Sequence, residues 1–296
     1  MWKFLTFLGV SLMAAGGLVA QVKKQFSVEK ASDCKVVNLF LTTKFGNCFI
    51  RPSENEEILS IYSNQEFDDF SHSFKNETVS SACNIHLDLV QKNKSGVGRT
   101  ISDRMLGADD RHSEEFWKVY LTETIPYNID LSYGLGHANI DLSGLAINRF
   151  KVNTGSADVH INYSGNSNKI EMDTFLVKVE FGTVTVKQIS RSKSKYVIAD
   201  VGFGNMMLDF SGANLTSKHV QGSVGAGNLV IVLPESNVPV VVNIKNSWLC
   251  SVQPIKGMKK ISDNSFVNQA YQENPKNALS FDLDVSMGNI VFKESK

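Results

Sequence analysis

The sequence predicts an all-β protein, and within that class a β-solenoid whose coils of about 20–30 residues stack on one another. One observation is an internal repeat, because the stretch at 133–161 returns 68 residues later at 201–231. Another is a recurring pattern, seen in FGNMMLDF, in which a glycine and a small polar residue precede alternating apolar residues. The third is spacing, since Gly182, Gly204 and Gly227 follow one another at intervals of 22 and 23 residues.

The composition is consistent with one large β domain or two ordinary ones within the 296 residues. The 30 basic and 30 acidic residues balance to a formal charge of zero and form no long block of one sign. Such a chain lacks the basic field that attracts nucleic acids and anionic membrane surfaces. We therefore expect no nucleic-acid partner.

Residues 1–20 have the layout of a secretory signal peptide, with Lys3 before an apolar run and Ala20 before Gln21. The run is at the short end for a membrane span, so we expect cleavage between Ala20 and Gln21. The alternative is an uncleaved N-terminal anchor. In either case the chain is exported, and no membrane span is expected beyond this segment.

The rest of the chain is expected to divide near Trp117. Residues 21–116 form an N-terminal β region that supplies the first coils and a cap, with a polar loop at 91–115. Residues 117–296 form the solenoid repeat region, with an insertion at 251–278 that breaks the rhythm. Long insertions in a solenoid emerge from one face and often bind partners, so these two segments are candidate binding loops.

Four cysteines follow the leader, and in an oxidising compartment an even number favours one or two disulfide bonds. None lies in a CxxC motif or has a histidine at metal-ligand spacing, which argues against thioredoxin-type and zinc chemistry. The full pairing stays open among three arrangements. The candidates are Cys34, Cys48, Cys83 and Cys250.

Tight turns are expected at the strand starts. Glycine there supplies a positive φ, and a short polar side chain bonds its own backbone. Within the strands, alternation such as that of Val177 with Val179 predicts inward positions at period two. The expected structural turn residues are Gly136, Asp141, Gly144, Gly155, Gly182, Gly204, Asp209, Gly212, Gly227 and Gly288.

Asp141 and Asp209 are the carboxylates to consider for catalysis, since paired acids cleave glycosidic bonds in many folds. They occupy the same position in two repeats, whereas a catalytic pair needs two different environments, so a turn cap explains them better. The GxG motifs lack the third glycine and the helix of a nucleotide site, and the histidines lack metal-ligand spacing. No catalytic residue, cofactor or metal is assigned.

The stretch YGLGHANIDLSGLAINRFKVNTGSADVHI, followed by VGAGNLVIVLP and a proline-led strand, resembles the toast-rack β-solenoid domains of bacterial envelope proteins. It is similar to the C-terminal domain of cell-wall-antibiotic-response membrane proteins and to the related "putative adhesin" domains of unknown function. The likeness covers roughly 117–252 of this chain. It implies a stacked β module for interaction or sensing, with no catalytic residues to carry over.

These observations predict a non-enzymatic, adhesin-like envelope protein that binds or scaffolds in the periplasm, on the outer surface or outside a bacterial cell. An envelope glycan or a partner protein is the expected ligand. One alternative is a carbohydrate lyase or hydrolase on a parallel β-helix, with acids and bases along one stacked face. Another is a self-assembling structural module, in which the solenoid ends join copies of the chain into a homo-oligomer.

Overall fold

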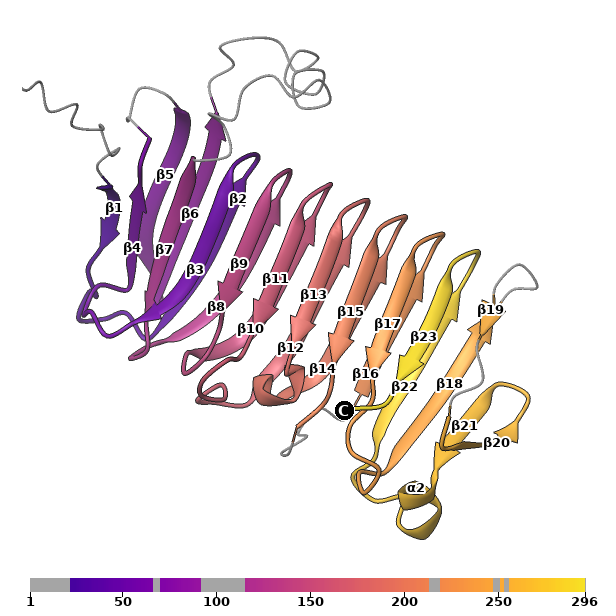
Figure 1. Ribbon diagram of the computed structural model, residues 1–296. Helices are drawn as coiled ribbons and strands as arrows, with labels where there is room; N and C mark the ends of the chain where they lie inside the picture. The colour runs from indigo at the N-terminus through magenta and orange to yellow at the C-terminus, as the bar shows by residue number, and fades with distance from the viewer. Residues whose placement is uncertain are drawn as a thin grey trace, which may run out of the picture.

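The computed structural model is a long stack of coils. Figure 1 shows the coils as a row of arches that runs from the indigo N-terminal end to the orange and yellow C-terminal end. Most arches carry one strand of each of two sheets, and buried side chains fill the space between the sheets. The structure describes residues 22–65, 70–91, 115–212, 219–246, 251–252 and 256–295.

We name the two sheets A and B and give the strands in spatial order, as far as the described residues form them. Sheet A contains 11 strands: β1 (Lys23–Val28), β4 (Leu59–Ser63), β7 (Phe116–Thr122), β3 (Asn47–Ser53), β9 (His137–Asp141), β11 (Asp158–Asn162), β13 (Thr183–Lys187), β15 (Asn205–Asp209), β17 (Asn228–Val232), β23 (Asn289–Lys293) and β19 (Ser251–Val252). Sheet B contains 12 strands: β20 (Met258–Ser262), β21 (Ser265–Asn268), β18 (Val240–Asn246), β22 (Leu279–Val285), β16 (His219–Val224), β14 (Ser194–Val201), β12 (Met172–Val179), β10 (Ala146–Thr154), β8 (Pro126–Tyr133), β2 (Val36–Thr43), β6 (Ala82–Gln91) and β5 (Phe70–Val79). Two short helices lie in the connections, η2 (Ile189–Ser192) and α2 (Gln269–Glu273).

Alternation along each strand decides which side chains face the core. In β12, Phe175, Val177 and Val179 are buried, while the residues between them are partly exposed. Because parallel neighbours pair in register, Val177 lies beside Val152 of β10 and Ala199 of β14. Each coil thus stacks its apolar side chains on those of the next, and the prediction of an all-β solenoid is confirmed.

The 68-residue sequence repeat corresponds to three coils. The turn that begins at Gly134 and the turn that begins at Gly202 are separated by two others, after β10 and after β12. Each turn is held to its neighbour by backbone hydrogen bonds, such as the 2.8 Å bond from Gly202 N–H to the Val179 carbonyl. The spacing of about 23 residues predicted from the glycines is therefore the length of one coil.

Chain order and spatial order differ at both ends of the stack. At the N-terminal end, coil β2–β3 lies inside coil β6–β7, because β2 pairs with both β6 and β8. At the C-terminal end, β22–β23 lies between β16–β17 and β18–β19. The segment 251–278 accordingly contributes β19 to sheet A and β21 to sheet B. The domain boundary that the sequence predicts at 116/117 falls within strand β7.

Antiparallel strands close the N-terminal end. β1 pairs with β4 at the edge of sheet A, and β5 pairs with β6 at the edge of sheet B. The ring of Phe26 on β1 lies 5.4 Å from that of His72 and 5.2 Å from that of Phe74, both on β5, so the two edges meet. Within the described ranges, no helix has the length and hydrophobicity needed to span a membrane.

Candidate functional site

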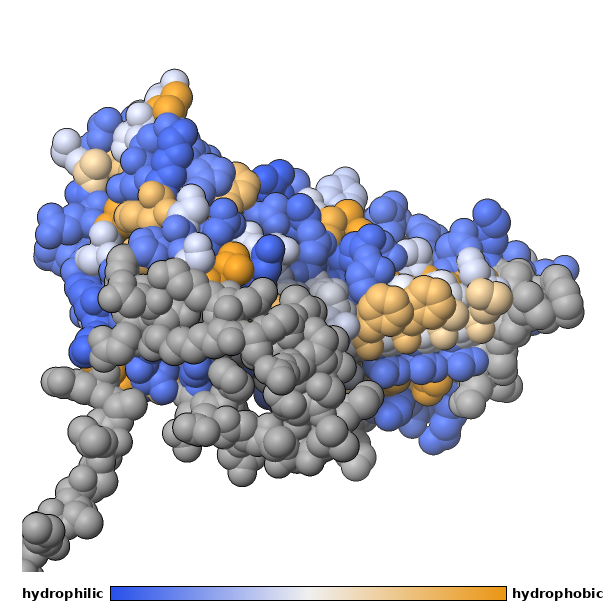
Figure 2. Space-filling view, turned by 90° about the horizontal axis from the view of Figure 1, so that it is seen from above, coloured by the Kyte–Doolittle hydropathy of each residue, from blue (hydrophilic) through white to orange (hydrophobic). Residues whose placement is uncertain are grey.

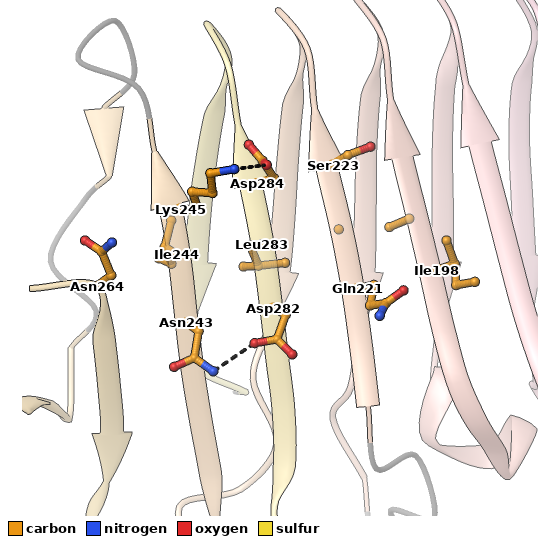
Figure 3. A pocket seen from close by; sticks show the side chains of 12 residues that line it. Ile198, Gln221, Ser223, Asn243, Ile244, Lys245, Asn264, Asp282, Leu283 and Asp284 are labelled. Carbon is orange, nitrogen blue, oxygen red and sulfur yellow. Dashed lines mark hydrogen bonds and ion pairs between the residues drawn. The ribbon is translucent and has the colours of Figure 1, made fainter. Parts of the chain in front are cut away.

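A groove of about 630 Å³ opens on the solvent-facing side of sheet B near its C-terminal end. Its floor is formed by the neighbouring strands β14, β16, β22 and β18, and Asn264 borders it from the turn between β20 and β21 (Figure 3). The Asn264 carbonyl accepts a hydrogen bond from the Ile244 N–H at 2.8 Å. Because Asn264 belongs to the segment 251–278, one of the two predicted binding segments borders this groove.

Strand register aligns the outward side chains of the groove in rows. Asp282 of β22 lies between Gln221 of β16 and Asn243 of β18. Two residues further along β22, Asp284 lies beside Lys245 of β18. Hydrogen-bonding groups from neighbouring strands therefore point to the same side, about 4.8 Å apart from strand to strand.

These polar side chains hold one another in place. Asn243 Nδ2 donates to Asp282 Oδ1 at 2.8 Å, and Ser265 Oγ donates to Asn243 Oδ1 at 2.8 Å. Lys245 Nζ lies 3.6 Å from Asp284 Oδ2, and these two side chains remain 84% and 58% exposed. The contacts orient the groups while leaving them accessible to a ligand.

Two rings extend the groove beyond its polar rows. Tyr196 of β14 is paired with His219 of β16, and their rings meet edge to face with centroids 6.1 Å apart. His219 Nδ1 lies 2.9 Å from Ser280 Oγ, and its Nε2 lies 3.5 Å from Asp282 Oδ2. Tyr196 is 49% exposed and precedes Ile198 by two residues on the same face, so it offers an apolar surface beside the groove.

The groove combines apolar surface with hydrogen-bonding groups, which suits a ligand that carries hydroxyl groups on an apolar ring. The planar amides of Gln221 and Asn243 donate and accept hydrogen bonds in fixed directions, and the carboxylate of Asp282 accepts them. Lys245 offsets the charge of Asp284, and Asp282 leaves the lining with one net negative charge. Across the described ranges, no three His, Cys, Asp or Glu side chains are grouped so as to hold a metal ion.

A second surface feature is a ridge along the turns that lead from sheet B into sheet A. Phe181, Phe203 and Met287 occupy equivalent turns and are 64%, 64% and 58% exposed. Figure 2, which looks onto this edge, shows hydrophobic residues in a row. The rings of Phe181 and Phe203 stack with centroids 5.4 Å and planes 7° apart, so each covers a face of the other. Because each ring covers a face of the other, the pair leaves less aromatic surface on which a sugar ring could pack. We therefore place the candidate binding site in the groove.

Asp141 and Asp209 are turn caps in the structure. Asp141 Oδ1 accepts a hydrogen bond from the Ser143 N–H at 3.0 Å, and Asp209 Oδ1 accepts one from the Ser211 N–H at 2.8 Å. Each closes a turn after a strand of sheet A. Because β11 and β13 lie between β9 and β15, the two carboxylates are about 14 Å apart, beyond the separation of a glycosidase pair.

The expected turn glycines divide into two groups. Gly136, Gly144 and Gly212 have a positive φ, of 125°, 69° and 103°. The expectation of a positive φ is wrong for the others, which lie outside the left-handed region: Gly155, Gly182, Gly204, Gly227 and Gly288. Their physical role is close approach, because a Cβ added at Gly204 would lie 2.4 Å from the Gly182 carbonyl oxygen of the neighbouring coil.

Cys34 and Cys83 form a disulfide bond, with Cα atoms 5.7 Å apart, which ties the chain before β2 to the start of β6. Cys48 is a buried free thiol, and burial raises its pKa to about 12, so it is no reactive thiolate near neutral pH. The remaining predicted positions lie outside the described residues: Ala20, Gln21, Cys250 and 92–114 of the polar loop.

The sequence prediction missed the groove residues. Its polar strand residues, such as Gln221, Asn243 and Asp282, lie at outward positions that alternation identifies, but alternation does not say which strands are neighbours. Asp282 lies beside Asn243, 39 residues earlier, and beside Gln221 of a still earlier strand. The coil length of about 23 residues gives no signal for these pairs, because β22 returns between β16 and β18.

Comparison with known proteins gives a family and a set of similar structures. The family model described as the N-terminal domain of toast_rack, DUF2154, matches residues 20–187. One similar structure is a "putative cell adhesion protein" from Clostridium sporogenes, with 17% identity, a TM-score of 0.44 and coverage of 93% of this chain and 99% of that chain. Another is a "putative adhesin" from Bacteroides fragilis, with 10% identity, a TM-score of 0.33 and coverage of 92% and 97%. No curated protein matches the chain.

Proposed function

Because the chain belongs to the family of the N-terminal domain of toast_rack (DUF2154), a stacked β fold, we propose that it is an exported, non-enzymatic binding protein of the bacterial cell envelope. The rigid stack is a scaffold that presents the sheet B groove, and the ligand is an envelope glycan. In this role the protein is adhesin-like, because it attaches to a surface polymer without changing it.

The observation that carries the proposal is the alignment of hydrogen-bonding side chains across the groove. Gln221, Asp282 and Asn243 lie side by side on three neighbouring strands (Figure 3). A sugar presents several hydroxyl groups that both donate and accept, and amides and carboxylates match both functions. The row runs along the axis of the stack, so an extended glycan would lie across the strands.

Export is supported by the disulfide bond between Cys34 and Cys83, since such bonds persist in oxidising compartments and are rare in the cytosol. The signal-peptide layout of residues 1–20 supports the same route. The destination in this proposal is the periplasm, the outer surface or the medium.

A binding role without turnover is supported by how the charges of the groove are paired. Asp284 is paired with Lys245, and Asp282 accepts a hydrogen bond from Asn243. A catalytic acid needs an environment that excludes water or adds negative charge. The two aspartate side chains are 46% and 58% exposed, so they suit the orientation of a ligand better than proton transfer.

A glycan-array screen that includes peptidoglycan fragments, with the chain from Gln21 onward, tests the proposal. We expect selective binding, and Asp282→Ala should weaken it at least about tenfold, because a hydrogen bond to a charged group contributes about 1.5–3 kcal/mol. Asp130→Ala is the matched control: Asp130 lies in the same row of sheet B, on β8, and pairs with Lys151 at 2.8 Å. Equal binding by both variants would remove the groove from the proposal, and silence on every glycan would remove the ligand class.

A carbohydrate lyase or hydrolase is the second candidate, because Asp282, Asp284 and Lys245 do lie outward on neighbouring strands. Incubation with each bound glycan, followed by assays for new reducing ends and unsaturated products, separates the two functions. Product formation that disappears in Asp282→Ala would replace the binding proposal with the enzymatic one.

A further inference from the structure

The outer edge of β5 is the N-terminal boundary of sheet B (Figure 1). β5 pairs with β6 along its whole length, and no other described strand pairs with it. In an antiparallel strand, every second residue directs its N–H and C=O away from the existing partner. The β5 edge therefore presents a row of backbone donors and acceptors that a further strand can use.

Much of this strand projects beyond the core. From Ser73 to Val79 every side chain is exposed, on both faces of β5. Phe74 and Val79 are 37% and 53% exposed although both are hydrophobic. Phe74 packs on the Phe26 ring at 5.2 Å and Val79 lies on the opposite face, so a strand paired with this edge would cover part of what each side chain leaves exposed.

The charges of β5 select one kind of partner. β5 contains one lysine, Lys75, and one acidic residue, Glu77. Lys75 Nζ lies 2.9 Å from Glu77 Oε2. When two copies of β5 lie antiparallel and centred on Asn76, Lys75 of each copy faces Glu77 of the other. Centring the pair on Lys75 or on Glu77 instead would place like charges opposite each other, which is destabilising.

We propose that two copies of this chain associate edge to edge through β5, antiparallel and about a two-fold axis at Asn76. Residues Ser73–Val79 of each copy pair, and the two B sheets become one. Seven residues a side make a small interface, so the dimer is weak and depends on protein concentration. The proposal is independent of glycan binding, because the groove lies at the opposite end of sheet B.

The other described sheet edges are less suited to pairing between copies. β20 carries Lys259 and Lys260, and in a two-fold pair centred on this strand Lys260 of each copy would face Lys260 of the other. β1 carries Lys23 and Lys24 with no acidic residue in the strand, and β19 has two residues. Lysine-rich or short edges are typical of strands protected against association.

Sedimentation velocity over a range of concentrations tests the dimer. Lys75→Glu and Glu77→Lys each place like charges opposite at two positions and should weaken association at least about tenfold. Mixing the two variants restores opposite charges in both pairs, so a mixed dimer should form with an affinity near that of the unaltered protein. The pair within the strand stays broken in both variants, and recovery on mixing therefore reports contact between copies.

Asn76→Cys tests the geometry. Residues on the two-fold axis face each other with Cβ atoms about 4.5–5.5 Å apart, so mild oxidation should give a covalent dimer. Ser73→Cys is the control on the same edge, since its symmetry mate lies six residues away, about 20 Å, and should not cross-link. Circular dichroism verifies that each variant folds. A protein that stays monomeric, with no cross-link at 76, would overturn the proposal, as would a dimer that survives both charge reversals.

Discussion

A column of glycines sets how closely neighbouring coils approach. A Cβ added at Gly204 would lie 2.4 Å from the Gly182 oxygen and 2.8 Å from Val179 Cγ2. Gly204→Ala should therefore destabilise the fold by about 1–3 kcal/mol, as overpacking does. Gly165→Ala is the matched control, because its Cβ would meet Ser143 at 3.6 Å, an ordinary contact. Urea unfolding measures both, and equal midpoints would contradict the packing role.

Two buried tyrosines differ in their hydrogen bonds. The Tyr127 hydroxyl donates to the Ile58 carbonyl at 2.7 Å and accepts from the Thr122 N–H at 3.1 Å. The Tyr163 hydroxyl is buried without a hydrogen-bond partner among the described residues. Tyr127→Phe leaves two buried backbone groups unpaired and should cost about 1–3 kcal/mol, whereas Tyr163→Phe should be neutral or stabilising. Thermal unfolding of the pair checks this, and equal losses would argue against it.

At the scale of elements, one carboxylate fastens β1 to β4. Glu57 lies just before β4; its Oε2 accepts a hydrogen bond from Lys24 Nζ at 2.7 Å and another from Ser60 Oγ. Hydrogen bonds from Lys24, then Ser60 and Ser27, lower the pKa of Glu57 from 4.5 to about 2. Because the folded-state pKa is the lower one, this stabilisation is present above pH 4.5 and is lost as the pH falls toward 2.

Hydrogen exchange across that pH range checks the fastening of β1. After correction for intrinsic rates, amides of β1 should lose protection relative to those of β12 as the pH falls from 4.5 to about 2. Glu57→Gln removes the titrating group, so the difference between the two strands should no longer change with pH. A β1 strand that keeps its protection at low pH in the unaltered protein would contradict the prediction.

Stacking explains which elements could be predicted from the sequence. Every coil repeats the same alternation, so the inward position of Val177 and the one-coil step from Gly182 to Gly204 follow from local pattern. The end coils could not be ordered, because parallel pairing depends on where the chain returns. Asp282 lies beside Gln221 because β22 pairs with β16, while β18 and β21 lie on the far side of β22. In the sequence alone, an outward polar residue of a binding groove cannot be distinguished from an ordinary solvent-exposed residue.

At the scale of the whole molecule, the groove and the β5 edge lie at opposite ends of sheet B. A dimer through β5 would therefore carry its two grooves at the far ends of one sheet and bind a polymer twice. Avidity then raises apparent affinity without any new contact. Lys75→Glu should weaken attachment to a polymeric glycan while leaving the affinity for a single short fragment unchanged. Calorimetry measures the affinity for the fragment, and retention on the immobilised polymer measures attachment. Equal effects of the substitution on both measurements would contradict the avidity prediction.

Because each coil contacts mainly its neighbours, the stack should tolerate the removal of one whole coil. Deleting 183–204 removes β13, η2 and β14 and joins Gly182 to Asn205. β15 then follows β12 as β13 did, so that β11 pairs with β15 and β12 with β16. We expect a folded protein that is shorter by one strand spacing, about 4.8 Å, in small-angle scattering.

Deleting 183–193 is the control for that coil deletion. It removes only β13 and η2, so Gly182 leads directly into β14. β14 would have to start at the ridge, whereas its parallel pairing with β12 requires it to start at the opposite edge. The smaller deletion should therefore weaken the β signal in circular dichroism and lower the unfolding midpoint more than the larger one does. The reverse result would mean that local strand contacts, and not whole coils, are the unit of stability in this molecule.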